Sequence, residues 1–140
     1  MAIKFIQMTF LTGINYLAVL VSSVIYYFIG FLWYSVLFAD TWKKETGIPD
    51  TAAKPASGAL IGQFASTLLF TLGVAIVLKL QGTNGVTGGL VTCALVTVFF
   101  VIPIHSGNLF FTGKKKLFLL DVCERALGSL TVGIVLGLWQ

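Results

Sequence analysis

Three charged side chains interrupt an otherwise apolar stretch of the sequence and are its best candidates for chemistry. Asp121, Glu124 and Arg125 lie within "KKKLFLLDVCERALGSL", residues 114–130. Asp121 and Arg125 are four residues apart, which places them on one face of a helix, and Glu124 lies next to that face. Carboxylate and guanidinium groups at this spacing can pair with each other, relay protons or bind a small charged solute.

Two further polar side chains, His105 and Asn108, precede the triple lysine on the neighbouring apolar segment. A helical rise of 1.5 Å per residue, counted from the triple lysine, puts Asp121 about 7 Å and Arg125 about 13 Å into the hydrocarbon. Counting in the other direction puts Asn108 at about 9 Å and His105 at about 13 Å. An isolated charge at the centre of a membrane helix costs about 2.5 to 3.5 kcal/mol. We therefore expect these two side chains to join Asp121, Glu124 and Arg125 in a buried polar cluster.

Two functions fit such a cluster. The first is a structural clasp in a small accessory membrane subunit, and the sequence favours it because acidic and basic groups occur together and can neutralise each other. Four short helices also enclose little volume in one protomer. The alternative is a proton-linked channel or a small-solute carrier, in which the same side chains line a hydrated path.

Enzymatic chemistry is the least favoured class. The chain has one histidine, and no nucleophile elbow, P-loop or HExxH spacing occurs. Glu124 and His105 are the general acid and base that such chemistry would have to use. The cysteines Cys93 and Cys123 form no metal-binding motif and are expected to act as small apolar fillers. We expect no catalytic residue, no metal and no cofactor.

The elements that must position these residues follow from composition. Of the 140 residues, 57% are hydrophobic and 10% are charged, against roughly 25% charged in an average soluble domain. Four apolar segments approach or exceed the ~20 residues that cross a bilayer. Backbone groups in lipid must be satisfied within each segment, so the segments are helices. The expected fold is an all-α, four-helix transmembrane bundle in one polytopic domain, with antiparallel neighbours and helices at residues 12–38, 57–80, 85–111 and 117–139.

Lysine and arginine placement sets the expected orientation. Lys43, Lys44, Lys54 and the triple lysine fall in two loops on one side, whereas Lys4 and Lys79 fall on the other. Both loops are therefore expected in the cytoplasm and both termini on the non-cytoplasmic side. The net charge of +4 fits a basic rim that faces lipid headgroups, so the bilayer is an expected partner and nucleic acid is not.

Small residues recur at a spacing that lets membrane helices approach closely. Four helices with three such faces leave at least one face for a second copy, so we expect a homo-oligomer, with an unidentified membrane protein as a further possible partner. The GxxxG pairs are Gly58 with Gly62, Gly85 with Gly89, and Gly133 with Gly137.

The first apolar segment carries polar and aromatic residues near its two ends. Trp33, Tyr34 and Trp42 are expected to form an aromatic belt at the cytoplasmic interface. Asn15 lies a few residues inside the outer face, and its amide needs a partner, which is a helix neighbour or interfacial water.

These residues also carry a resemblance. The chain resembles the domain of unknown function 1761 family of small bacterial membrane proteins over most of its length. The resemblance implies a four-helix membrane domain with no established activity, and a location in the bacterial inner membrane. It does not extend to the triple lysine or to Glu124 and Arg125. It rests on Ile14, Asn15, Tyr16, Gly30, Trp33, Tyr34, Phe38, Trp42, Asn108, Phe110 and Asp121.

Overall fold

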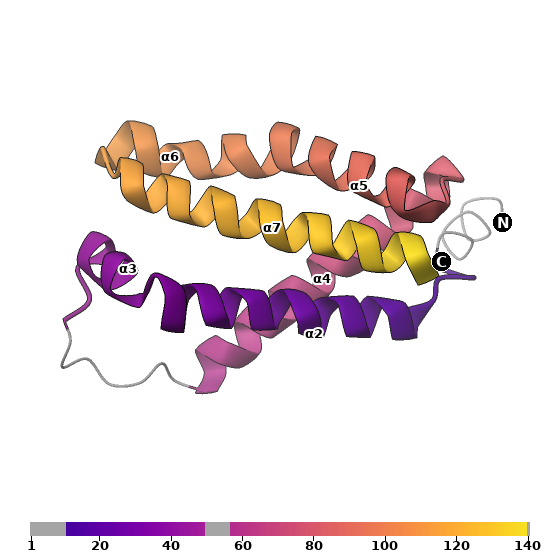
Figure 1. Cartoon of the computed structure of the whole chain (residues 1–140), viewed down its shortest axis with the longest axis horizontal. Helices are drawn as coiled ribbons and strands as arrows, with labels where there is room; N and C mark the ends of the chain where they lie inside the picture. The colour runs from indigo at the N-terminus through magenta and orange to yellow at the C-terminus, as the bar shows by residue number, and fades with distance from the viewer. Residues whose placement is uncertain (1–10, 50–56, 140) are drawn as a thin grey trace, which may run out of the picture.

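Helices make up nearly all of the described chain. The computed structural model describes residues 11–49 and 57–139, and Figure 1 shows how their helices pack side by side. Within these ranges no strand occurs, which confirms the all-α class. The elements are α2 (Tyr16–Leu32), the π-helical segment η1 (Trp33–Leu37), α3 (Ala39–Thr46), α4 (Ser57–Gln81), α5 (Gly85–Val96), the π-helical segment η2 (Thr97–Val101), α6 (Ile102–Thr112) and α7 (Lys115–Trp139).

Three helical stretches are long and apolar enough to cross a membrane. They are Tyr16–Leu37, Ser57–Gln81 and Gly85–Thr112. The fourth expected helix is present as α7, which has 25 residues but is not one of these three candidate spans. Residues 11–49 and 57–139 are therefore helical, apart from short connections, and their apolar helices suit a membrane.

The first helix begins four residues later than expected because Asn15 caps it. The Asn15 carboxamide oxygen accepts from the backbone N–H of Ala18 at 3.1 Å, which satisfies one of the free donors of the first turn. Its Nδ2 donates to the carbonyl of Trp139 at 2.9 Å. The amide partner expected from the sequence is thus a neighbouring helix, and one side chain joins the start of α2 to the end of α7.

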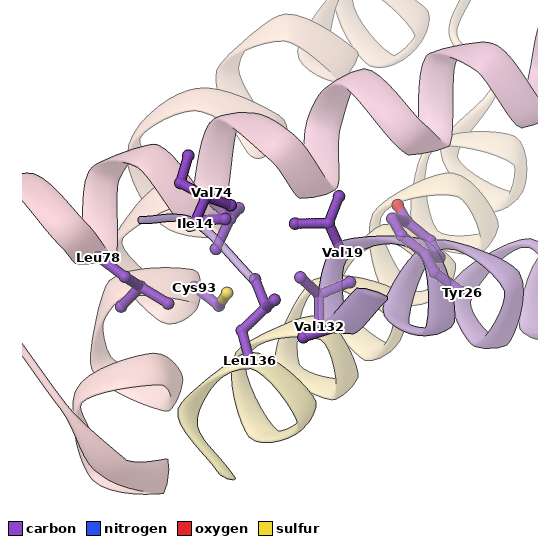
Figure 2. Close-up of a cluster of buried hydrophobic side chains, with 10 residues drawn as sticks. Ile14, Val19, Tyr26, Val74, Leu78, Cys93, Val132 and Leu136 are labelled. Carbon is purple, nitrogen blue, oxygen red and sulfur yellow. The ribbon is translucent and has the colours of Figure 1, made fainter. Parts of the chain in front are cut away.

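The core forms where α7 packs along α5 on one side and along α2 on the other. α4 runs obliquely behind α2, so its first turns lie far from those of α7 (Figure 1). α4 packs mainly on α2, and it meets α5 less extensively than the short connection between them led us to expect. Figure 2 shows apolar side chains gathered between these helices, from Ile14 and Leu136 at one end to Tyr26 farther along α2. They include Ile14, Val19, Tyr26, Val74, Leu78, Cys93, Val132 and Leu136.

Glycine pairs explain how closely α5 and α7 approach. A methyl group added at Gly133 would lie 2.5 Å from the carbonyl oxygen of Gly89, and one added at Gly137 would lie 2.5 Å from that of Gly85. Two of the three GxxxG pairs are therefore used inside one chain, against each other. The third pair is open, because an added methyl group at Gly58 or Gly62 meets no atom within 4 Å.

The π-helical segment η1 leads into the end of the bundle that holds α3, whereas η2 lies at the middle of the helical stretch Gly85–Thr112. η2 leads into α6, which has Pro103 in its first turn, and proline lacks the N–H that would bond one turn back. At the end of the bundle that holds α3, the Nζ of Lys114 donates to the carbonyl of Glu45 at 2.7 Å. This bond joins the turn between α6 and α7 to α3. The lysines of α3 and the triple lysine thus share one end of the bundle, whereas Lys4 and Lys54 lie outside the described residues.

Candidate functional site

Asp121 receives hydrogen bonds from two other elements. Its Oδ1 accepts from the Tyr34 hydroxyl at 2.9 Å, and its Oδ2 accepts from Nδ2 of Asn108 at 3.4 Å. Asn108 comes from α6, as depth counting predicts. The η1 segment supplies Tyr34, so this carboxylate links three parts of the bundle.

Glu124 and Arg125 form an ion pair one helical turn deeper. Oε2 of Glu124 lies 3.6 Å from Nε of Arg125, and Glu124 is 3% exposed. Neither of these two atoms has a hydrogen-bond partner among the described residues. Arg125 also interacts with the phenol of Tyr26. Glu124 is therefore buried beside a partly exposed Arg125, and the pair keeps part of its hydrogen-bonding capacity unused.

Gly30 makes room for the Glu124 carboxylate. A methyl group added at Gly30 would lie 3.1 Å from Oε1 of Glu124, which is tighter than ordinary van der Waals contact. Tyr26, Gly30 and Tyr34 follow one another at intervals of four residues, so they lie on one face along α2 and η1. That face meets the charged part of α7.

The charged residues line a partly enclosed cleft of about 760 Å³. Its lining comes from α2, η1, α3, the first half of α4 and the first half of α7. Figure 1 shows that this half of α4 diverges from α7. α3 contributes Trp42 and Lys43, and the rings of Tyr34 and Trp42 meet edge to face at 5.8 Å. The lining comprises Tyr26, Tyr27, Gly30, Phe31, Tyr34, Ser35, Ala39, Trp42, Lys43, Leu60, Gln63, Thr67, Asp121, Glu124 and Arg125.

The polar side chains expected to cluster do not all reach this cleft. Asp121, Glu124 and Arg125 line it, and Asn108 touches it only through Asp121. His105 lies apart from the cleft and does not line it. Its Nδ1 is 3.0 Å from the carbonyl oxygen of Val101, which is the last residue of η2.

Sequence reasoning missed the α2 and α4 sides of the cleft. The sequence predicts an interfacial position for Tyr34 but not the hydrogen bond that its hydroxyl donates to Asp121. Trp33, from the same expected belt, packs against Phe38 with ring centroids 4.5 Å apart. The signal that could have pointed to the α2 side is the four-residue spacing of Tyr26, Gly30 and Tyr34. No comparable pattern marks Gln63 and Thr67 on α4.

A second, smaller cleft of about 380 Å³ lies at the opposite end, lined by residues that include Asn15, Lys79 and Trp139. Between the two clefts the bundle is closed by buried side chains, several of which carry hydroxyls. Ser22, Ser23 and Thr71 each donate to a carbonyl one turn back on their own helix, at 2.7, 2.7 and 2.9 Å. These three side chains are fully buried, and their hydroxyls need no water as a hydrogen-bond partner. The buried residues around them therefore separate the two clefts.

Comparison with known proteins places the chain in a family. No curated protein and no solved structure matches it. The family model described as "Protein of unknown function (DUF1761)" matches residues 17–137, a range that contains every side chain of the larger cleft. The chain therefore belongs to this family of proteins of unknown function.

Proposed function

We propose that the protein is a small-solute carrier of the inner membrane and that the larger cleft is its solute-binding site. One observation carries the proposal. Oε2 of Glu124 and Nε of Arg125 are buried and lack hydrogen bonds, and both residues line a cleft of about 760 Å³. Small-molecule sites in proteins typically have volumes of about 300 to 1,000 Å³, with a few polar groups on apolar walls.

The same observation weighs against a purely structural clasp. A buried polar network stabilises a fold when every member is satisfied, and a partly satisfied network is worse than an apolar core. Here the Glu124–Arg125 pair keeps unused bonding capacity beside open space. A bound solute or water would supply the missing partners.

The carrier proposal requires α7 to be a fourth membrane-spanning helix. Its 25 residues extend over about 37 Å at 1.5 Å per residue, which exceeds the ~30 Å of the hydrocarbon core. Asp121, Glu124 and Arg125 line the cleft, so α7 can turn them away from lipid. The end with α3 and the triple lysine is then cytoplasmic, by the distribution of lysines.

Water access to the cleft tests this proposal. In a chain with Cys93 and Cys123 replaced by alanine, Gln63→Cys should react with a charged, water-soluble methanethiosulfonate about tenfold faster than Ile61→Cys, because thiolate forms only in water. Ile61 is a stringent control, since it lies nearer the start of α4 and is 69% exposed, but does not line the cleft. Labelling in membrane vesicles gives both rates. Equal labelling rates for the two cysteines would show that water does not fill the cleft, and the carrier proposal would be wrong.

A second candidate function is self-association through α4, for which the open Gly58 and Gly62 are the specific observation. The other two glycine pairs are occupied inside the chain, so this pair is the one that a second copy can use. If so, Gly58→Leu combined with Gly62→Leu should reduce the mass of the protein–detergent complex, measured by light scattering, to that of one chain. A wild-type complex that already has the mass of one chain would rule the homo-oligomer out.

A further inference from the structure

We infer that the solute of the larger cleft is a zwitterionic amphiphile: its head group, with an ammonium and an acid group, binds among the charged residues, and its alkyl chain leaves the cleft toward lipid. This inference rests on the proposed function and specifies the class of ligand. Three features of the cleft lead to it: its balance of charges, its aromatic wall and its apolar mouth.

The charges that line the cleft are balanced. Asp121 and Glu124 contribute two acidic groups, and Lys43 and Arg125 contribute two basic ones. A ligand with a net charge would leave one protein charge uncompensated in a site of low dielectric, which is costly. A ligand with one charge of each sign leaves the balance intact. Oε2 of Glu124 and Nε of Arg125 are ion-paired at 3.6 Å but make no hydrogen bond, so they offer one acceptor to an ammonium and one donor to an acid group.

The aromatic wall suits the positive part of such a head group. Tyr26, Tyr27, Tyr34 and Trp42 line the cleft together with the two carboxylates. Aromatic faces attract ammonium groups, most strongly where water is excluded. The acidic and aromatic groups thus recognise the same end of the ligand, while Arg125 recognises the other.

The mouth of the cleft explains why the ligand needs an alkyl chain. Phe31 on α2 and Leu60 on α4 both line the cleft, and they are 50% and 44% exposed. Each belongs to a candidate membrane span, so the part of its exposed surface that lies outside the cleft would meet lipid in a bilayer. An alkyl chain that passes between them covers apolar surface on both sides, whereas a fully water-soluble zwitterion leaves them unused.

Tryptophan fluorescence can test the ligand class directly. With Trp33→Phe and Trp139→Phe, Trp42 in the cleft is the only tryptophan of the chain. In non-ionic detergent, this protein is titrated with brominated-chain phosphatidylethanolamine, phosphatidylglycerol or diacylglycerol, whose heads are zwitterionic, anionic and uncharged. We expect half-maximal quenching of Trp42 at an about tenfold lower mole fraction of the zwitterionic lipid. A matched chain that keeps only Trp139, at the opposite end, should show the same quenching by all three.

Charge-neutral variants identify the residues that read the head group. In the Trp42-only chain, Glu124→Gln should abolish the preference for the zwitterionic lipid, and Asp121→Asn provides the same test if the first variant does not fold. Quenching of Trp42 that is equal for the three lipids, or strongest for the anionic one, would overturn the inference, as would a preference that survives both variants.

A further measurement separates failure of the inference from failure of the carrier proposal. Glycerophosphoethanolamine has the same zwitterionic phosphodiester head but no alkyl chain, and it can be tested for protection of Gln63→Cys against the methanethiosulfonate. Protection by glycerophosphoethanolamine without selective quenching by lipid would keep the solute site and remove the amphiphile. Selective quenching of Trp42 by the zwitterionic lipid, with only weak protection of Gln63→Cys by the chainless head group, supports the inference. If Gln63→Cys is not accessible to water at all, the carrier proposal fails first.

Discussion

Replacing Gly133 with leucine is expected to prevent the helices from packing into the native bundle. The new Cβ would lie 2.5 Å from the carbonyl oxygen of Gly89 and 3.0 Å from the sulfur of Cys93. Backbone atoms cannot swing aside as a flexible side chain can, so α5 and α7 must separate along their most extensive contact. Overpacking typically costs about 1 to 3 kcal/mol, and a clash with backbone at this interface should exceed that range. Loss of the cooperative unfolding transition in detergent, followed by circular dichroism, would be the result.

The control is Gly73→Leu on α4. Gly73 is exposed, and an added Cβ there meets no atom within 4 Å. We expect its melting temperature to stay within about a degree or two of the wild-type value, as for other surface substitutions. If Gly133→Leu and Gly73→Leu shifted the transition equally, the glycine interface between α5 and α7 would be wrong.

Arg125→Leu is expected to produce the second large effect. The substitution leaves the Glu124 carboxylate, 3% exposed, without the cation that lies 3.6 Å away. Breaking a buried ion pair by removing one partner costs about 3 to 5 kcal/mol, because the remaining charge is uncompensated. Arg125 is 31% exposed, so the loss here should be at or below the lower end of that range. A denaturant titration in detergent measures the loss as a lower free energy of unfolding.

A double variant separates the stranded charge from lost packing. In Glu124→Gln with Arg125→Leu no charge remains to be compensated, so most of the lost stability should return. A double variant as unstable as Arg125→Leu alone would mean that the arginine acts by packing its long side chain, and that its pairing with Glu124 contributes little to the fold.

The helices themselves could be predicted from the sequence because lipid allows few alternatives. An apolar segment of sufficient length has to be helical, and the expected bounds differ from those of α4 and α7 by two residues at most. Which glycines meet could not be predicted, since the three GxxxG pairs look alike in the sequence. Their use depends on the crossing of α4 behind α2 (Figure 1), which no local pattern encodes.

The candidate site was predictable on one side only. The contact between Asn108 and Asp121 could be predicted by counting the helical rise from the triple lysine, because a short turn fixes how α6 and α7 lie against each other. The same counting fails for His105, whose ring turns to the carbonyl of Val101 on its own helix. Tyr34 and Gln63 come from helices joined to each other by a long connection, which leaves their position relative to α7 unspecified.

The hydrogen bond from Asn15 to Trp139 has a mechanical consequence. It pins α2 to α7 at the end opposite the larger cleft, so that end can act as a pivot and α2 as a lever. The 17 residues of α2 form an arm of about 25 Å at 1.5 Å per residue, and a rotation of 5° would displace its tip by about 2 Å. By this geometry, a small rotation about the Asn15 end would change the width of the cleft by more than the length of a covalent bond, while residues beside the pivot would hardly move.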